Sequence, residues 1–541
     1  MTNYLDNVAL QYNWTAPGAV ILLWAMVVLI FGVACNKNKN ESQLISRLIC
    51  LSIIPIIIGI MLQISAIYNY SVTVINTSFL ASRVDSFLKI LCDHLCFSKI
   101  RMVIQLAVLV GAFLCLIVFA SYYNPNWFWR KLNQSTLDAR KIDGKMLNIN
   151  AASFSFESLF LLCCYVFGLW LLPLANDLLT IYLVLELIAL CLYPLIVQRD
   201  SLNSKIISLE VGIKYFVLSA TMSCVYLLGT MFIYAALGGV DFENIAAAIT
   251  ILPNDSSLVI VVLGLVLVIF GIMFKLSAAP FHFWAPDLYH GTNTLIIMIV
   301  SSIGKIGSIG VLFTLLQYTK HILQLHNVIM IVGCVSLIIG GFGGLFQQNI
   351  RRLLAYSTIG HIGFIILGFA TGDNLGYAAA LIYGAIYSLC IAIPLFAGLI
   401  IIEALLGIKL QQISDLANLA KRNSTLSLFF TVIVLSIAGI PPFIGFFAKF
   451  YVLKSLIINK FYFATGIAVI MSVVSCAYYL KIIKVIYYNE NNDLFKEDDI
   501  IQYDLRPKSL VSLVLIWGLG TTSIYVIYAN DIYNYIVELL V

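Results

Sequence analysis

The sequence has 541 residues, of which 61% are hydrophobic and 11% are charged, and its formal net charge is +5. Charged residues make up about a quarter of a soluble globular protein, so the composition excludes that class. Apolar runs of about 18 or more residues recur along the chain, which is typical of a polytopic α-helical membrane protein. The small net charge gives no indication of nucleic-acid binding.

The hydrophobic pattern predicts an all-α protein with about fourteen transmembrane helices. The expected spans are roughly 18–35, 49–68, 101–121, 154–173, 177–198, 206–236, 257–288, 292–317, 327–346, 352–371, 375–404, 424–459, 462–487 and 509–529. Three N-terminal spans and an inside loop occupy 1–153, and an inside loop with the last span occupies 488–541. Between them, 154–317 and 318–487 are expected to form two five-helix units. The odd number makes the second unit an inverted repeat of the first.

The seventh and twelfth spans are too long for one straight crossing at 1.5 Å per residue. Pro280 and Pro286 interrupt the seventh span, and Pro441 and Pro442 interrupt the twelfth. Both are expected to be discontinuous helices. Such breaks are tolerated at membrane depth only where they are buried in protein or line a wet cavity.

Basic residues predict the orientation of the chain. Twenty of the 31 lie in odd-numbered loops and seven lie in even-numbered loops. Loops on the cytoplasmic or matrix side carry the excess of Lys and Arg, so the odd loops are expected there and both termini on the other side. The remaining four basic residues lie inside spans and are Lys214, Lys275, Lys305 and Lys449.

These intramembrane charges predict a proton or cation path. Glu186 and Lys214 lie on consecutive antiparallel spans at comparable depth, about 13 residues before the inside loop and about nine residues after it. They form either a static link between two helices or a switchable pair that loads and unloads a proton. Lys275, Lys305 and Lys449 have no carboxylate neighbour in sequence. A buried cation costs about 2.5–3.5 kcal/mol in hydrocarbon, so three of them predict a hydrated path.

Other polar residues are weaker candidates. His282 and His361 are possible relay members, although a hydrogen-bonded packing role is the commoner one for a buried histidine. Glu403 is expected at the inner membrane interface. The cluster Cys92-Asp93-His94-Leu95-Cys96 lacks the paired CxxC elements of structural zinc sites, so no metal site is predicted. No phosphate loop, haem or iron–sulfur pattern occurs, and the energy source is therefore expected on another chain.

Four stretches carry a family resemblance: MFKLSAAPFHFWAPDLYHGTNT, SSIGKIG, FQQNIRRLLAYSTIGHIGF and AGIPPFIGFFAKFYVLKSLI. They resemble the antiporter-like membrane subunits of proton-pumping NADH:quinone oxidoreductase (respiratory complex I), and the subunit 2 type in particular. The resemblance runs from about Phe154 to Lys484 and also relates the chain to Mrp-type antiporter subunits. It implies a coupling pair, a central relay and a terminal lysine, in the order Glu186 with Lys214, Lys275 with Lys305, and Lys449.

The resemblance implies a proton-translocating membrane-arm subunit, part of an enzyme but without a redox centre of its own. NADH, FMN, iron–sulfur clusters and ubiquinone would belong to partner subunits of both arms, which include sibling antiporter-like chains, and membrane lipids would surround the protein. Two alternatives stay open, a stand-alone or Mrp-type cation/proton antiporter and a structural subunit with static charges. The residue usage of an AT-rich genome and the absence of a presequence favour an organelle-encoded protein of the mitochondrial inner membrane, with the bacterial plasma membrane as the alternative.

Overall fold

The computed structural model describes residues 15–30, 41–73, 98–123, 155–198, 202–251, 256–406, 409–488 and 510–540. Within these ranges the chain is mostly helical, with turns between the helices and isolated β-bridges that join Asp177 to Asp241 and Asn349 to Gln412. Eleven described helical stretches are long and apolar enough to cross a membrane. The predicted all-α membrane fold is confirmed. The total of fourteen spans, the inverted repeat and the segment boundaries stay predictions.

The described helices follow in chain order. The N-terminal part has Thr15–Ile30, α2 (Glu41–Thr73) and α4 (Lys99–Tyr123). The middle part has α6 (Phe156–Leu171), α7 (Leu178–Val197), α8 (Leu202–Leu237), α9 (Phe242–Ile251), α10 (Ser256–Leu276), α11 (Trp284–Gly291), α12 (Thr294–Ser301) and α13 (Ile303–Tyr318). The last part has α14 (Leu323–Leu345), α15 (Ile350–Ala370), α16 (Asn374–Ala385), α17 (Ile393–Leu406), α18 (Leu419–Arg422), α19 (Ser424–Ala438), α20 (Ile444–Ile458), α21 (Tyr462–Tyr488) and α22 (Leu510–Leu540).

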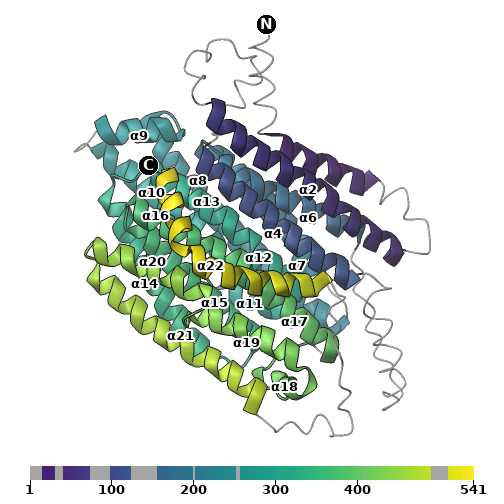
Figure 1. Ribbon diagram of the computed structural model, residues 1–541. Helices are drawn as coiled ribbons and strands as arrows, with labels where there is room; N and C mark the ends of the chain where they lie inside the picture. The colour runs from purple at the N-terminus through teal and green to yellow at the C-terminus, as the bar shows by residue number, and fades with distance from the viewer. Residues whose placement is uncertain are drawn as a thin grey trace.

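The long helices run side by side in one bundle (Figure 1). The N-terminal helices α2 and α4 lie at one edge, and α14 and α21 lie at the opposite edge. The C-terminal helix α22 crosses the bundle and packs against α4, α17, α16 and α20. It therefore joins the N-terminal helices to the last part of the chain.

Both predicted helix breaks are present. The first follows α10, whose last residue precedes Pro280 by four positions, and Ser277 adopts a left-handed conformation with φ of 59°. The N–H groups of Ser277 and Ala278 bond back to the last turn of α10 at 2.9 and 3.0 Å. This is the Schellman arrangement that ends many helices, and it stops α10 in the middle of the predicted span.

The second break repeats the same cap. The helix α19 ends at Ala438, and Gly439 follows in the left-handed region with φ of 79°. Its N–H donates to Ser436 at 3.0 Å, and the N–H of Ile440 donates to Leu435 at 3.3 Å. Glycine adopts this conformation without a steric penalty. Each broken span thus exposes the carbonyl end of a half-helix within the bundle.

Two spans that the sequence predicts as continuous are irregular in the structure. The eighth span bends at Ser302, which separates α12 from α13 and whose hydroxyl donates to the Met298 carbonyl. Such side-chain bonds to the preceding turn compete with the regular helical pattern and often bend helices. The eleventh span contains a π-helix, η3 (Ile386–Ala392), between α16 and α17. Its apolar pattern contains no signal for that extra residue per turn.

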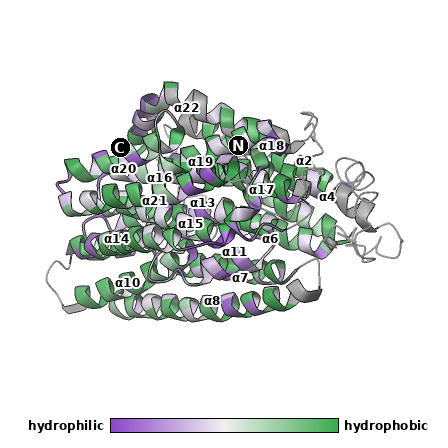
Figure 2. Ribbon diagram, turned by 90° about the horizontal axis from the view of Figure 1, so that it is seen from below, coloured by the Kyte–Doolittle hydropathy of each residue, from purple (hydrophilic) through white to green (hydrophobic). Residues whose placement is uncertain are grey.

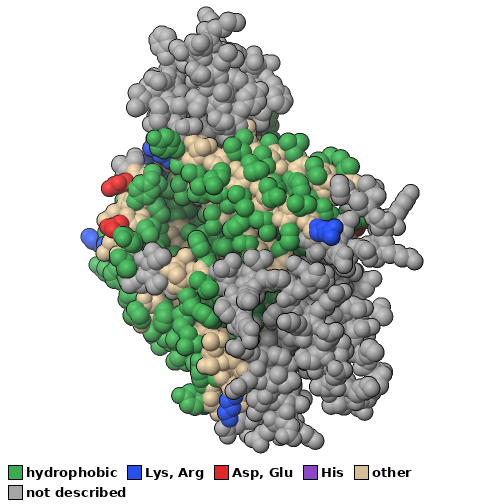
Figure 3. Space-filling view, turned by 45° about the vertical axis from the view of Figure 1, so that its right-hand side comes forward, with side chains coloured by type: hydrophobic (Ala, Val, Ile, Leu, Met, Phe, Trp, Pro, Cys, Tyr) green, Lys and Arg blue, Asp and Glu red, His purple; other side chains and the backbone are tan. Residues whose placement is uncertain are grey.

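The surface and the interior of the bundle differ in polarity. Large apolar side chains are exposed on the outer helices, for example Met231 at 67% and Val473 at 67%. In Figure 3 the described part of the face is mostly hydrophobic, with a few charged side chains near its margins. Hydrophilic residues lie in the middle of the bundle around α7, α11, α13 and α15 (Figure 2). This inverted arrangement suits a protein with a lipid-facing exterior and a polar path inside.

Glycines allow the closest helix pair to approach at backbone distance. A Cβ atom on Gly340 of α14 would lie 2.5 Å from the backbone nitrogen of Gly360 on α15. No real Cβ tolerates that distance, so the two backbones pack directly against each other. Small residues at helix crossings are the usual device for close packing in membranes.

We predict that Gly340→Ala lowers the thermal stability of the purified assembly, because α14 and α15 must separate to admit the methyl group. The expected cost is about 1–3 kcal/mol, as for other overpacked sites. Gly466→Ala is the matched control, since a Cβ at Gly466 on α21 would have no heavy atom within 4 Å. An equal change in thermal midpoint for both variants would contradict the packing argument.

Candidate functional site: buried lysines at broken helices

Lys305, on the following span, binds the carbonyl end of α10. Its side chain is 1% exposed and lies over the ring of Trp284 at 5.1 Å. Nζ donates to the carbonyls of Lys275 at 3.3 Å and Leu276 at 2.8 Å, and to Ser277 Oγ at 2.9 Å. The last carbonyls of a helix lack an intrahelical donor and carry the negative end of the helix dipole. Three acceptors match the three N–H donors of a protonated lysine.

Lys449 occupies the corresponding place at the second break. Its side chain is 7% exposed, and Nζ donates to the Ala438 carbonyl at the end of α19 at 2.7 Å. The ring of Phe364 lies 5.6 Å away. A Cβ on Gly439 would lie 2.9 Å from the Cδ of Lys449, so the glycine also makes room for the lysine. Unlike Lys305, Lys449 makes one hydrogen bond through Nζ among the described residues.

Lys275 is on the last turn of α10 but turns away from the break. Its Nζ donates to Ser219 Oγ on α8 at 2.9 Å and lies 5.8 Å from the rings of Tyr215 and Phe274. It also lines a cavity of about 20 Å³ together with Ser308 and aromatic side chains. A cavity of that size holds about one water molecule.

Glu186 is the carboxylate that acts electrostatically on Lys275. It lies on α7, is half-buried, and makes no ion pair among the described residues. Its charge also acts on Tyr215, whose ring contacts Lys275. The structure therefore brings Glu186 towards Lys275 rather than into a direct pair with another lysine.

Lys214 is not paired with Glu186 in this structure. Its Nζ lies 2.7 Å from Glu210, one turn earlier on α8, and 3.8 Å from Asp287 on α11. The side chain of Lys214 is 51% exposed. Arg352 approaches the same Asp287 at 3.5 Å. These four charged groups form a cluster on the side of the bundle.

The direction of Lys214 follows from helix geometry. Gly212 packs against Tyr193 and Val197 of α7, so that side of α8 faces α7. Lys214 comes two residues later, about 200° around the helix axis. Comparable depth on neighbouring helices, which the sequence predicts, is therefore not sufficient for contact.

His361 lies in a buried hydrogen-bonded cluster. Nδ1 pairs with the hydroxyl of Tyr383 at 2.9 Å and Nε2 with the hydroxyl of Tyr479 at 3.2 Å. The Tyr479 hydroxyl also contacts Ser357 Oγ, and the ring of Tyr387 stacks on His361 at 4.9 Å. Lys449 acts electrostatically on this histidine. His361 thus lies between α16, α21 and the second lysine.

A second polar chain runs beside it from the first break. The hydroxyls of Tyr387 and Tyr289 both contact Thr358 Oγ1, at 2.8 and 3.1 Å. Tyr387 belongs to the π-helix, and such segments occur frequently at functional sites. The neighbouring Ser388 is buried, and its hydroxyl has no hydrogen-bond partner among the described residues. The hydroxyl-bearing residues inside apolar spans are the only sequence signal for this chain.

His282 is in the turn between α10 and α11 and is 6% exposed. Its ring lies 4.5 Å from that of Phe283 and 6.5 Å from that of Tyr356 on α15. Nδ1 has no hydrogen-bond partner among the described residues. The structure places this histidine beside the break but shows no contact with the lysines.

A buried ion pair on the inner side is absent from the sequence-based prediction. Arg351, one of the basic residues in the odd-numbered loops, is 3% exposed and contacts Glu403 of α17. It also donates to the Thr292 carbonyl at 3.0 Å and to Thr294 Oγ1 at 2.9 Å. Thr294 in turn donates to Glu403 at 2.8 Å. Glu403 is therefore part of a network that joins α12, α15 and α17.

The polar residues form two groups. The first contains Glu186, Lys275 and Lys305, with Lys305 bonded to the backbone of Lys275. The second contains His361 and Lys449. No group of three metal-ligating side chains occurs among the described residues, and the segment 92–96 lies outside them.

Comparison with known proteins identifies the family. Residues 175–475 match the family described as NADH:quinone oxidoreductase/Mrp antiporter, transmembrane. NADH-quinone oxidoreductase subunit N of Pelagibacter ubique is 31% identical over 527 residues, which cover 94% of this chain and 99% of the relative. Subunit N of Hydrogenovibrio crunogenus is 35% identical over 370 residues, 68% of this chain and 76% of the relative. Both relatives are bacterial.

Solved structures share the fold at lower identity. A chain of respiratory complex I from Thermus thermophilus aligns with a TM-score of 0.67 at 20% identity, covering 96% of this chain and 98% of that one. A chain of the Mrp complex from Dietzia aligns with a TM-score of 0.70 at 18% identity, covering 97% of each. The chain belongs to the NADH:quinone oxidoreductase/Mrp antiporter family, as an antiporter-like membrane subunit of the subunit N (subunit 2) type.

Proposed function

We propose that the chain moves protons across the membrane as a membrane-arm subunit of NADH:quinone oxidoreductase. The observation that carries the proposal is the placement of Lys305 and Lys449 at the carbonyl ends of two broken helices. A protonated lysine is stabilised at such an end, and a neutral one gains much less from it. NADH oxidation and quinone reduction, with FMN and iron–sulfur clusters, would occur in the partner subunits.

Glu186 and Lys275 are proposed as the acid–base pair of the first half. Lys275 has one hydrogen bond through Nζ, a carboxylate in electrostatic range and a cavity of about 20 Å³ beside it. A cavity of that size admits about one water, so the group can exchange its proton. Movement of Glu186 would change the charge around Lys275 and with it the lysine's affinity for a proton. Lys305 would receive the proton next, after it has passed its own proton onward, and its three acceptors stabilise the protonated form.

His361 and Lys449 are proposed as the second half. The imidazole has a tyrosine hydroxyl at each nitrogen, an arrangement through which a proton can be relayed. Lys449 is the terminal lysine of the series. His282 is proposed as an accessory relay member at the first break, because its unpartnered nitrogen can bind a water molecule.

Lys214 is proposed as a member of the path on the side of the bundle. It is half-exposed and has two carboxylates within 4 Å, with which it can exchange its proton. This role differs from the buried position of Lys275. The two lysines therefore make a matched pair for mutagenesis.

An Mrp-type antiporter is the second candidate function. The fold does not separate the two, because a solved Mrp chain aligns as well as one from complex I. The subunit N relatives favour complex I by sequence. Recovery of the native chain without any peripheral redox subunit would decide for the antiporter.

The cellular membrane is the finer part of the proposal. The residue usage favours a mitochondrial inner membrane, whereas the relatives found are bacterial and favour a bacterial plasma membrane. Fractionation of the source cells, with the chain detected by mass spectrometry, separates these two locations. The proton chemistry of the chain is the same in both.

We predict that Lys449→Arg and Lys449→Ala both remove most of the proton pumping coupled to NADH oxidation. An arginine keeps a positive charge beside the Ala438 carbonyl but does not release its proton. The measurement is the proton-to-electron ratio of the assembled complex in liposomes, with the amount of complex checked on native gels. Normal pumping by the arginine variant would indicate a static charge with a structural role.

We also predict that Lys275→Ala reduces the proton-to-electron ratio much more than Lys214→Ala. The first change removes a half-buried group that lines an internal cavity, while the second removes a half-exposed one whose two neighbouring carboxylates can still bind a proton. Both variants are compared at equal assembly and equal NADH oxidation by the peripheral arm. A larger loss in Lys214→Ala would reverse the proposed order of the two lysines.

A further inference from the structure

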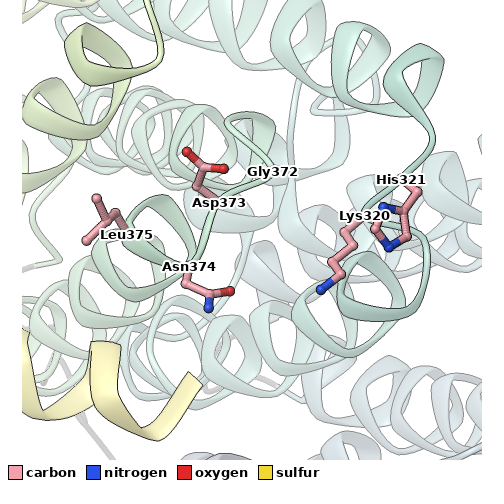
Figure 4. Close-up of a pocket in the computed structure, with 6 residues that line it drawn as sticks. All are labelled: Lys320, His321, Gly372, Asp373, Asn374 and Leu375. Atoms are coloured by element: carbon pink, nitrogen blue, oxygen red, sulfur yellow. The ribbon is translucent and has the colours of Figure 1, made fainter. Parts of the chain in front are cut away.

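An open hollow lies at the outer end of the bundle, and none of the buried lysines lines it. Its volume is about 550 Å³, within the range of small-molecule sites. Two turns form it, one between α13 and α14 and the other between α15 and α16 (Figure 4). The lining residues are Lys320, His321, Gly372, Asp373, Asn374 and Leu375.

The hollow presents charges of both signs on opposite walls. Lys320 and His321 lie on the turn before α14, and Asp373 lies on the turn before α16 (Figure 4). None of these three side chains makes an ion pair among the described residues. A ligand that carries an anionic group and a nearby cationic group could pair with Lys320 and with Asp373 at the same time. A purely anionic ligand would meet the carboxylate of Asp373.

A buried histidine packs behind Gly372, which lines the hollow. His326 is 5% exposed, and its Nε2 pairs with the Lys320 carbonyl at 3.0 Å. Its Nδ1 makes no hydrogen bond of normal geometry, although the Phe369 backbone lies nearby. A Cβ on Gly372 would lie 3.2 Å from Cε1 of this ring, and Gly372 has φ of 75°. The glycine therefore lets the turn that lines the hollow pack closely against the imidazole.

The position of the hollow indicates where its ligand comes from. It lies where four predicted membrane helices end, and Leu323, the first residue of α14, is 66% exposed next to it. Asn374 also contacts the last turn of α22 through the Leu540 carbonyl at 3.4 Å. An apolar surface that passes into a two-signed polar hollow matches the shape of a phospholipid, with acyl chains on the helices and the headgroup in the hollow.

We propose that the hollow binds the headgroup of a phospholipid that carries a primary ammonium group, as in a phosphoethanolamine lipid. The phosphate lies against Lys320 and His321, and the ammonium donates hydrogen bonds to Asp373. A trimethylated ammonium has no N–H group to donate, so a choline headgroup satisfies this wall less well. The inference does not depend on proton transport by the chain.

The test counts lipids retained by the assembled complex after detergent exchange. The complex is re-equilibrated with equal amounts of phosphatidylethanolamine, phosphatidylcholine and phosphatidylglycerol, and bound lipids are measured by mass spectrometry. We expect selective retention of phosphatidylethanolamine. Asp373→Asn should weaken that retention by about ten-fold, the usual effect of removing a charge-assisted hydrogen bond, and leave phosphatidylglycerol unchanged or raised.

Two further variants keep the test decisive. Lys320→Gln, at an exposed position of the turn, should weaken retention of every phospholipid at this place and serves if Asp373→Asn fails to assemble. Lys460→Gln is the matched control, a basic residue on another outer turn that does not line the hollow. Equal retention of the three lipids by the wild-type complex, or equal retention by wild type and both hollow variants, would overturn the proposal.

Discussion

The contact between a lysine ammonium group and the uncovered carbonyls of a half-helix is the interaction on which the interior of this protein depends. A helix that ends inside a membrane protein leaves several carbonyls without donors, and each unsatisfied group is costly in a low-dielectric interior. A lysine buried alone is costly for the same reason. Lys305 at α10 and Lys449 at α19 remove both costs at once. Because the contact depends on the proton, the same interaction that stabilises the fold can change during transport.

The sequence predicts the two breaks and the burial of Lys305 and Lys449 because these are local signals. Prolines inside an over-long apolar run favour an interrupted helix, although Pro194 lies within the continuous α7, and a charge inside such a run stands out from its neighbours. The partners of those charges are not local. Lys214 and Glu186 match in depth, but Gly212 turns that face of α8 towards α7 and leaves Lys214 on another side. A rotation of about 200° within two residues is invisible to an argument based on depth alone.

The remaining features depend on packing between distant segments. The pairing of Arg351 with Glu403, and the tyrosines around His361, each join residues more than 20 positions apart. The bend at Ser302 and the π-helix at Ile386–Ala392 occur in runs whose composition is fully compatible with a regular helix. Periodicity indicates which residues can be helical but not where the helix takes an extra residue. These irregular places are also where the polar groups converge, as expected if function rather than stability sets them.

The network around Arg351 contrasts with the lysines, which are proposed to exchange protons. It joins α12, α15 and α17 on the inner side through the Arg351–Glu403 ion pair and hydrogen bonds to Thr292 and Thr294. A guanidinium group keeps its proton throughout the physiological range. The guanidinium therefore stays charged whichever lysine is loaded, and the network can hold the inner ends of these helices together. Proton transfer among the central lysines would then leave the inner ends of α12, α15 and α17 in place.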